Sequence, residues 1–255
     1  MSTSRASFSS STDGGGASAT AGASHTLRII YLCTSNVCRS PLAEAVAADI
    51  VASRGLDARG VEVVSRGLTD GYSAWGHPAE PRMVKAAERL RLGRETMRRL
   101  GGHGSTLLQR EEAADPNSLL FLVTSHHASW TAEAVGSDVL DAARAAGRLR
   151  LIDSAGGDVA DPFFGGQEEY NTVAAHIVAE LPRTLDAALR ERGILATDEP
   201  ACAPPLEVGG GGGGSGSSSS SSTEIALLEA AAAAADAGRR FGALQGGAYA
   251  PPGRN

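Results

Sequence analysis

One short stretch of the chain holds residues that could carry out phosphoryl chemistry. Cys33 and Cys38 lie five residues apart, and Arg39 follows at once. A cysteine thiolate is a strong nucleophile, and a guanidinium can hold two oxygens of a phosphoryl group together. A cysteine and an arginine at this spacing occur by chance in many proteins, so the elements around the stretch must decide whether it is a site.

The stretch lies between an apolar run and a helical pattern. Leu27 to Leu32 predict a buried strand, and Pro41 to Arg54 predict a helix with Ser40 as N-cap. A loop from a strand end into a helix N-terminus points backbone N–H groups inward, and the helix dipole adds positive charge, so such a loop binds a tetrahedral dianion. The same field would keep Cys33 as a thiolate without a partner histidine.

The alternation of strand and helix continues along the chain. The strand candidates are near-continuous hydrophobic runs, as in strands covered by helices on both faces. The sequence therefore predicts an α/β fold with a four-stranded parallel sheet, doubly wound, resembling the flavodoxin-like three-layer sandwich. Ligands in such folds bind at the carboxyl ends of the strands. The remaining expected strand and helix pairs are Val61–Ser65 with Pro81–Leu92, Leu119–Thr124 with Trp130–Ala146, and Leu149–Asp153 with Gln167–Arg192, which Pro182 would kink or restart.

Composition divides the chain into one folded domain and two tails. Residues 1–25 are almost entirely Ser, Thr, Ala and Gly, and residues 196–255 pass into Gly, Ser and Ala runs. Such segments cannot bury enough apolar surface to offset the entropy of ordering, so both are expected to be disordered. The folded domain is expected over residues 26–195. Within the second tail, Thr223 to Phe241 is a good local helix former.

Charge and cysteine content exclude several classes of protein. The net charge is −6 without a basic stripe, so no nucleic-acid partner is expected. No apolar run approaches the roughly 20 residues that span a bilayer, and the N-terminus lacks the apolar core of a secretory signal peptide. Both features favour a cytoplasmic protein that does not bind membranes. The alternative is an organelle transit peptide, which the Ser-rich start faintly resembles. Three cysteines without zinc-type spacing predict neither a disulfide scaffold nor a metal or cofactor, and Cys202 sits in a linker with nothing near it. A monomer is expected.

The extended motif IIYLCTSNVCRSPLAE, from Ile29 to Glu44, closely resembles the signature of the low-molecular-weight protein tyrosine phosphatases. The resemblance spans roughly residues 27–192. It implies an enzyme that hydrolyses phosphotyrosine in a protein, or a small aryl phosphate, through a phosphocysteine intermediate. Cys33 would be the nucleophile and Arg39 the group that grips the phosphate. The rest of the phosphate loop would be Thr34, Ser35, Asn36, which holds the loop in a strained shape, Val37, Cys38 and Ser40.

The resemblance also implies a general acid, Asp161, in the stretch Asp161-Pro162-Phe163-Phe164 after the fourth strand. By itself an Asp-Pro pair is usually only a turn. An acid is needed because a phenolate leaves poorly unless it is protonated, and the same carboxylate can act as base when water attacks the phosphocysteine. Phe163 would form an apolar wall for the substrate, with Phe164 as a second candidate.

Further matches are weaker. Ser65 corresponds to a family serine that hydrogen-bonds the loop asparagine, or it simply caps a strand end, and His103 belongs to the same network or to an ordinary turn. Strict alignment places Ser73 where relatives have an aromatic residue at the mouth of the site, so Tyr72 or Trp75 could supply that wall.

Two regions depart from the family pattern. The segment between Leu92 and Leu119 is longer than usual, and His126 and His127 stand where relatives have a Met-Asp or Met-Thr stretch. Adjacent histidines point different ways, so they do not form a metal pair, and solvent exposure is expected for both.

Three other functions stay open. Related arsenate reductases need further cysteines on a movable segment, and the domain has none beyond Cys38. Phosphoarginine phosphatases are associated with Thr at the position of Val37, where an aliphatic residue favours an aromatic ester. A binding module for phosphorylated partners would not need Cys33 and Asp161. Oxidation could also form a reversible Cys33–Cys38 disulfide, whereas the alternative is a buried structural thiol at Cys38.

Overall fold

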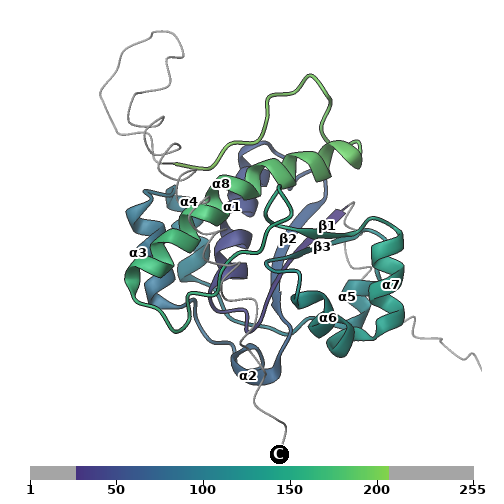
Figure 1. The fold of residues 1–255 in the computed structure, drawn as a ribbon. Coiled ribbons are helices and arrows are strands. Elements are labelled where there is room, and N and C mark those ends of the chain that lie inside the picture. The colour runs from purple at the N-terminus through teal and green to yellow at the C-terminus, as the bar shows by residue number, and fades with distance from the viewer. Residues whose placement is uncertain (1–26, 207–255) are drawn as a thin grey trace, which may run out of the picture.

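The centre of the protein is a parallel sheet of four strands. The computed structural model describes residues 27–206, in which β1 (Leu27–Cys33), β2 (Val61–Gly67), β3 (Ser118–Leu122) and β4 (Leu149–Leu151) lie in the order β2-β1-β3-β4 (Figure 1). All pairings are parallel, and the register sets Cys33 opposite Gly67 and Leu32 opposite Leu122. The predicted four-stranded parallel sheet is therefore confirmed.

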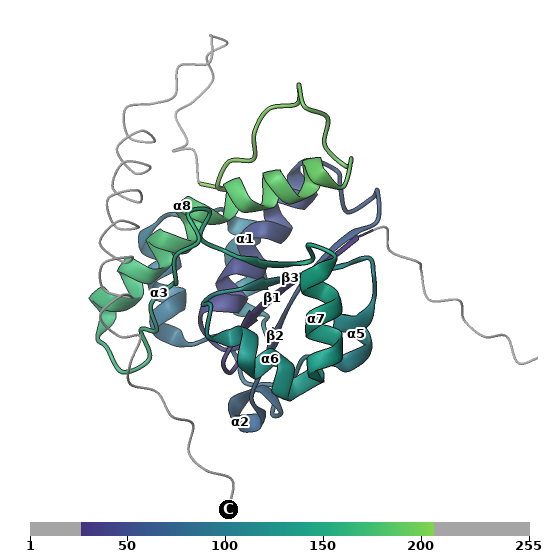
Figure 2. The same ribbon diagram turned by 45° about the vertical axis from the view of Figure 1, so that its right-hand side comes forward.

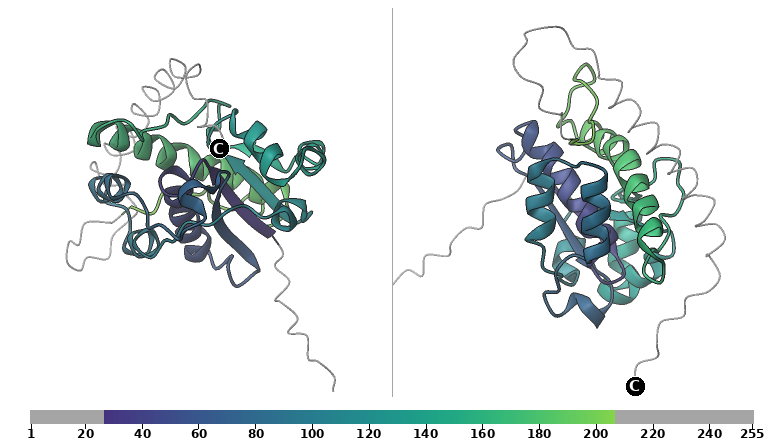
Figure 3. Two further views of the ribbon diagram at one scale, coloured as in Figure 1. Left: turned by 90° about the horizontal axis from the view of Figure 1, so that it is seen from below. Right: turned by 90° about the vertical axis from the view of Figure 1, so that its left-hand side faces the viewer.

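Helices cover both faces of the sheet, as Figures 1 and 2 show and the views in Figure 3 support. The predicted three-layer, doubly wound arrangement is thereby confirmed. A short helix, α2 (Asp70–Ser73), follows β2 at the carboxyl end of the sheet. One layer consists of α1 (Arg39–Ser53), α3 (Pro81–Arg89), α4 (Arg94–Gly101) and α8 (Gln167–Glu191), and the other of α5 (Arg110–Ala114), α6 (His127–Val135) and α7 (Ser137–Ala145).

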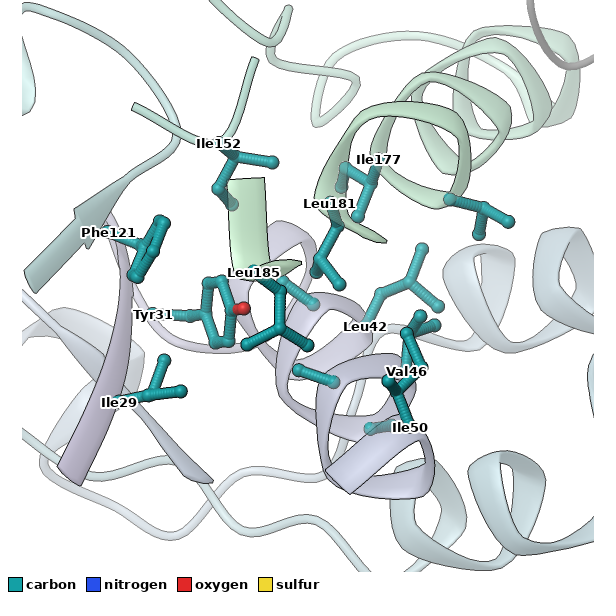
Figure 4. Packing of buried hydrophobic residues seen from close by; sticks show 14 of the residues in the cluster. Ile29, Tyr31, Leu42, Val46, Ile50, Phe121, Ile152, Ile177, Leu181 and Leu185 are labelled. Atoms are coloured by element: carbon teal, nitrogen blue, oxygen red, sulfur yellow. The ribbon is translucent and has the colours of Figure 1, made fainter. Parts of the chain in front are cut away.

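Alternate residues of the strands supply two hydrophobic cores. Ile29 and Tyr31 of β1 belong to the core shared with α1 and α8, whereas Ile30 and Leu32 belong to the core beneath α6 and α7. Figure 4 shows the first core, where the rings of Tyr31 and Phe121 lie 5.2 Å apart in front of leucines from α1 and α8. Burial of strand residues on both faces explains why the strands appear in the sequence as continuous apolar runs.

Two predicted helices have different bounds in the structure. The single helix expected over Trp130–Ala146 is two helices, because Gly136 between them has a φ of 98°, which ends a right-handed helix. The last helix does not restart at Pro182, since α8 continues through this buried residue. Packing of the long apolar face of α8 therefore outweighs the loss of one backbone hydrogen bond.

The segment between Leu92 and Leu119 contains two short helices, α4 and α5, that the sequence pattern did not predict. The first turn of α4 is capped by a side chain from α1, and the first turn of α5 is capped by its own residues. Asp49 of α1 accepts hydrogen bonds from the backbone N–H and the hydroxyl of Thr96, at 3.1 and 2.7 Å. Glu112 and Gln109 form a capping box at α5.

Residues 196–206 pack against the domain, although the sequence assigns them to a tail. Cys202 is only 9 % exposed and its backbone N–H donates to Asp186 at 3.1 Å, so the expectation that nothing lies near it is wrong. Leu206 forms an isolated antiparallel β-bridge with Leu92, which lies just after α3. The expected tail at residues 1–25, the remainder of the second tail and the helix over Thr223–Phe241 lie outside the described residues.

Arg148 is expected to be a major source of stability. It is 5 % exposed, and its Nη1 donates to the carbonyls of Ala113, Asp115 and Ser118 at 3.0 to 3.2 Å. Arg148→Met would leave these acceptors without their donor, so we expect a loss of about 2–4 kcal/mol in the free energy of unfolding. Urea denaturation measures it.

Arg150→Met is the matched control two residues further along, in β4. Arg150 pairs with Glu191, which is more than half exposed, and such pairs contribute about 1 kcal/mol or less. Equal losses for the two variants would contradict the role given to Arg148.

Candidate active site

The loop Thr34 to Cys38 connects the last residue of β1, Cys33, with the first residue of α1, Arg39. Within residues 27–206, no backbone N–H of this loop donates to a protein acceptor. Free N–H groups beside a helix N-terminus form a concavity that binds anions. Cys33 is buried at this concavity, and Ser35 in the loop is half-buried. The arrangement suits a phosphoryl group held against the Cys33 sulfur.

Asn36 gives the loop its curvature. It is fully buried with a φ of 52°, a left-handed conformation that asparagine tolerates better than most residues. Its Nδ2 donates to Ser65 Oγ at 2.7 Å and to Ser40 Oγ at 3.1 Å, and its Oδ1 accepts from the Thr106 backbone N–H at 2.9 Å. Its carbonyl oxygen lies 2.7 Å from His103 Nε2. The side chain and the backbone are therefore both held.

Ser65 links this asparagine to a carboxylate. Ser65 lies inside β2, so it does not cap a strand end, and its hydroxyl donates to Glu44 Oε2 at 2.5 Å. Nδ1 of His103 lies 4.0 Å from the same oxygen. The contact between Ser65 and Asn36 expected from the resemblance is present, and His103 joins the same network. Sequence reasoning gave Glu44 no role, although it is the last residue of the motif.

Ser40 does not cap α1 as the sequence predicts. The helix begins at Arg39 with Cys38 as its cap residue, and no side chain makes a capping hydrogen bond. The Ser40 hydroxyl instead lies 2.9 Å from Cys33 Sγ. Because this hydroxyl already accepts a hydrogen bond from Asn36, its own proton is available to the sulfur.

Arg39 closes the far side of the loop. It is 3 % exposed, and its guanidinium donates to Asp161 Oδ2 at 2.7 Å and to the Val159 carbonyl at 3.2 Å. Its Nη2 also lies 3.5 Å from Thr34 Oγ1. Its Nε is buried and has no hydrogen-bond partner among the described residues. The loop and the segment that carries Asp161 therefore meet at one cation, and the Asp161 side chain is about half exposed.

Cys38 differs from Cys33 although both are free thiols in one loop. Burial raises the pKa of Cys38 well above its usual value, against the opposing effect of Arg39. Cys38 is therefore an uncharged thiol at neutral pH. Val37 is also buried, and its carbonyl accepts a hydrogen bond from the Glu80 N–H at 2.6 Å, which ties the loop to the start of α3.

Two of the four aromatic wall candidates lie together. The rings of Tyr72 and Phe163 are 6.4 Å apart, although they come from segments after β2 and β4. Trp75 is 76 % exposed and Phe164 is 85 % exposed. The rings of Phe163 and Phe164 meet edge-on. Ser73, at the position aligned with an aromatic residue, is buried instead.

Ser73 packs against Gly67 so closely that no side chain fits at position 67. A Cβ on Gly67 would lie 1.8 Å from Ser73 Oγ, so α2 packs directly on the end of β2 through two small residues. The neighbouring residue Tyr72 is about half exposed, and its ring meets that of His77 edge-on at 5.0 Å.

His127 is buried, contrary to the expectation of solvent exposure for both histidines. It is 2 % exposed, whereas His126 is exposed. Its Nε2 lies 3.1 Å from Thr34 Oγ1 and its Nδ1 lies 3.0 Å from Thr124 Oγ1. Burial, and then the charge of Arg39, hold the pKa of His127 well below its usual value. The sequence offered no signal for this contact, because nothing local shows that the segment after β3 reaches the phosphate loop.

Arg82 connects the segment of Asp161 with the phosphate loop. Its Nη1 donates to the Gly165 carbonyl and its Nε to Glu80 Oε1, both at 2.8 Å, and its guanidinium lies 4.5 Å from the centre of the Tyr170 ring. The backbone of Glu80 in turn holds Val37. The sequence alone gave Arg82 no role in the site.

Residues 27–206 contain neither a recognisable metal centre nor a helix that could span a membrane. No three His, Cys, Asp or Glu side chains in this part of the chain are grouped so that they could hold a metal ion. Likewise, none of its helices is both long enough and apolar enough to cross a bilayer.

Residues 28–193 match the family described as low molecular weight phosphotyrosine protein phosphatase. A search among curated protein sequences found no match. Among solved structures, a mutant of the YwlE arginine phosphatase with a phosphorylated active site serine is 26 % identical, with a TM-score of 0.50, over 66 % of this chain and 100 % of that one. YfkJ from Bacillus subtilis is 19 % identical, with a TM-score of 0.51, over 67 % and 98 % of the two chains. A low molecular weight phosphotyrosine phosphatase from Vibrio cholerae O395 is 15 % identical, with a TM-score of 0.51, over 65 % and 98 %.

The buried ring of His127 should make the protein less stable in acid. Its pKa is lowered in the fold, so the unfolded chain binds more protons below the ordinary histidine value of 6.5. The stabilisation is therefore complete above about pH 6.5 and is lost toward the folded-state pKa, by up to about 1.4 kcal/mol per pH unit. Urea denaturation at pH 7.5 and pH 5.5 should show a larger loss for the wild-type protein than for His127→Gln.

His126→Gln is the control, because this exposed neighbour should leave the pH dependence of the wild-type protein unchanged. Identical slopes for the wild-type protein and His127→Gln would show that the buried ring does not carry the effect.

Proposed function

The chain belongs to the low molecular weight phosphotyrosine protein phosphatase family, and we propose that it hydrolyses phosphotyrosine esters through a phosphocysteine at Cys33. Members of this family are hydrolases that act on phosphorylated proteins or small phosphates. The proposed substrate is a protein that carries phosphotyrosine, or a small aryl phosphate. The enzyme would act as a cytoplasmic monomer without metal or cofactor.

One observation carries the proposal: a buried thiol, a loop of unpaired N–H groups and a buried guanidinium that contacts a carboxylate all converge. Arg39 and Asp161 are 122 residues apart in the sequence, yet the Arg39 guanidinium donates to the Asp161 carboxylate at 2.7 Å. Cys33 lies at the start of the loop that ends at Arg39. A thiolate, donors for three phosphoryl oxygens and an acid are the groups that phosphomonoester hydrolysis through cysteine needs.

Hydrogen bonds that begin at Asn36 support a thiolate at Cys33. The amide Nδ2 donates to the Ser40 oxygen, which leaves the Ser40 proton to point at Cys33 Sγ, 2.9 Å away. The second proton of the same amide goes to Ser65, whose own proton goes to Glu44. Each hydroxyl in this network therefore accepts from Asn36, and the Ser40 hydroxyl is left to donate to the Cys33 sulfur. A donor at this position stabilises the charged nucleophile.

In the first step, Cys33 Sγ attacks phosphorus and the bond to the phenolic oxygen breaks. Arg39 and the loop N–H groups hold the equatorial oxygens, where charge is spread in the transition state. The phosphoryl oxygens would compete with Asp161 for the Arg39 guanidinium. Once it is displaced from Arg39, the Asp161 carboxylate takes up a proton from solvent, and the resulting acid gives that proton to the leaving oxygen. The product alcohol then departs neutral, and phosphocysteine remains.

In the second step, water attacks the phosphocysteine. Asp161, now a carboxylate, accepts a proton from the water, the S–P bond breaks, and inorganic phosphate and the Cys33 thiolate are formed. Ser40 would stabilise the departing thiolate through the same hydrogen bond that supports it at the start.

An aromatic leaving group fits the mouth of the site. The rings of Tyr72 and Phe163 form a pair at this mouth, and a phenyl ring can pack against their apolar surfaces. Val37 supplies an aliphatic side chain in the loop, where relatives that act on phosphoarginine have Thr. Trp75 and Phe164 are further wall candidates on its exposed rim.

Phosphoarginine hydrolysis is the second candidate, because one structural neighbour is an arginine phosphatase. Its reaction uses the same nucleophile and phosphate loop, so only the leaving group distinguishes the two. An arsenate reductase is disfavoured, since Cys202 packs against Asp186 and Cys38 is the only other cysteine of the domain. A non-catalytic phosphopeptide-binding module would not need the thiol and the carboxylate to meet at Arg39.

Phosphate release from a phosphotyrosyl peptide, with EDTA present, tests the proposal. We expect turnover that chelation does not change and that Cys33→Ser lowers by at least about three orders of magnitude, because the nucleophile is lost. Cys202→Ser is the matched control and should retain activity, because Cys202 packs beside Asp186 of α8 and is not part of the loop. Turnover that survives Cys33→Ser would contradict the mechanism, and turnover of phosphoarginine alone would favour the second candidate.

The role of Asp161 predicts a dependence on the leaving group. Asp161→Ala should lower kcat by about 10²- to 10³-fold for a phosphotyrosyl peptide, and by less for p-nitrophenyl phosphate, whose leaving oxygen needs less protonation. Arg82→Met should show the same pattern more weakly, because it loosens the segment of Asp161 at Gly165. Steady-state kinetics with both substrates measure the two ratios.

Arg89→Met controls for the loss of a positive charge on α3, since Arg89 pairs with Glu168 on an exposed surface. Equal losses for both substrates in Asp161→Ala would argue against a general acid at this position.

A further inference from the structure

His127 has no part in the mechanism above, yet it contacts the phosphate loop directly. It is buried near the start of α6, in the segment that follows β3, and its Nε2 lies 3.1 Å from the hydroxyl oxygen of Thr34. Thr34 is the residue after the proposed nucleophile, Cys33. A buried polar side chain that reaches such a residue can determine how the loop presents its groups.

The hydrogen bonds around His127 favour one tautomer. Thr124 Oγ1 accepts from the His127 backbone N–H at 3.3 Å, and the same hydroxyl lies 3.0 Å from Nδ1 of the ring. Within the described residues Thr124 Oγ1 has no other side-chain partner, so its proton is best used as a donor to Nδ1. The proton of a neutral ring then resides on Nε2, which donates to Thr34. Burial and the nearby charge of Arg39 lower the pKa of His127, which keeps the ring neutral.

This tautomer sets the polarity of the Thr34 hydroxyl. Thr34 Oγ1 faces two donors, His127 Nε2 at 3.1 Å and Arg39 Nη2 at 3.5 Å. A hydroxyl oxygen has two lone pairs, so both are occupied and the hydroxyl proton is left for a third group. In the proposed function Arg39 binds the phosphoryl group of the substrate, so a phosphoryl oxygen can accept the Thr34 hydroxyl proton.

We propose that His127 is a positioning residue for phosphoryl transfer: its Nε2–H fixes the Thr34 hydroxyl so that the oxygen supports Arg39 and the proton is presented to the substrate phosphate. The inference rests on the proposed phosphatase function. It adds a contribution from the segment after β3 to a site otherwise built from segments after β1, β2 and β4.

Variants of His127 that differ in donor position test this role. In glutamine the amide nitrogen can replace Nε2, and in asparagine it can replace Nδ1. We expect His127→Leu and His127→Asn to lower kcat about tenfold with little change in KM, because a buried hydrogen bond to the loop is lost. His127→Gln should recover most of that loss. His126→Leu, next to it but exposed, is the matched control and should behave as the wild-type protein.

Thr34→Val and the double variant His127→Leu/Thr34→Val show whether the histidine acts through the hydroxyl. We expect the double variant to be no slower than the slower of the two single variants. Losses that multiply, a kcat for His127→Leu equal to that of the wild-type protein, or an asparagine variant faster than the glutamine variant would each overturn the proposal.

The tautomer can be measured without turnover. ¹⁵N NMR of the histidine rings in the full-length wild-type protein should show His127 protonated at Nε2 and bare at Nδ1, and the opposite tautomer or a charged ring at pH 7 would overturn the proposal even if variants fail to fold. A wild-type protein that shows this tautomer but does not hydrolyse a phosphotyrosyl peptide would instead contradict the proposed function. The two failures are therefore distinguishable.

Discussion

The left-handed backbone of Asn36 is the constraint on which the site depends. A non-glycine residue with a φ of 52° costs free energy, of order 1 kcal/mol or more, and persists only where its surroundings hold it. Here Ser65, Ser40, Thr106 and His103 all hold the residue. This conformation turns the chain sharply between β1 and α1, and the loop N–H groups consequently have no protein acceptor within the described residues. The loop proposed to bind phosphate is therefore stabilised by polar contacts that lie behind it.

The same network separates two cysteines that the sequence places five residues apart. Cys33 faces the hydroxyl of Ser40, whose proton is directed by the Asn36 amide. Cys38 borders the same apolar core as Cys33, and burial raises the pKa of its thiol. A short loop thus holds one thiol beside the Ser40 hydroxyl and another whose charged form is disfavoured by burial. Reactivity follows from the surroundings rather than from the residue type.

Sheet topology determines which segments surround the loop. In the order β2-β1-β3-β4, β1 lies between β2 and β3, so the segments after these three strands meet at one edge. The segment after β2 contributes Tyr72, and the segment after β4 contributes Asp161. The segment after β3 contributes His127, which meets the loop because β3 is hydrogen-bonded beside β1. Arg82 of α3 then connects the segments after β2 and β4 through Glu80 and Gly165.

The sequence by itself determined the α/β class, the four strands and the motif from Cys33 to Ser40, because continuous apolar runs and a loop before a helix are local patterns. It also pointed to Asp161, though only through the resemblance. Tertiary structure decided where α1 begins, the break at Gly136 and the packing of residues 196–206. It also decided that His127 is buried and that Glu44 and Arg82 support the site. Each of these depends on contacts between segments distant in sequence, and no periodicity or local preference records which strand lies beside which.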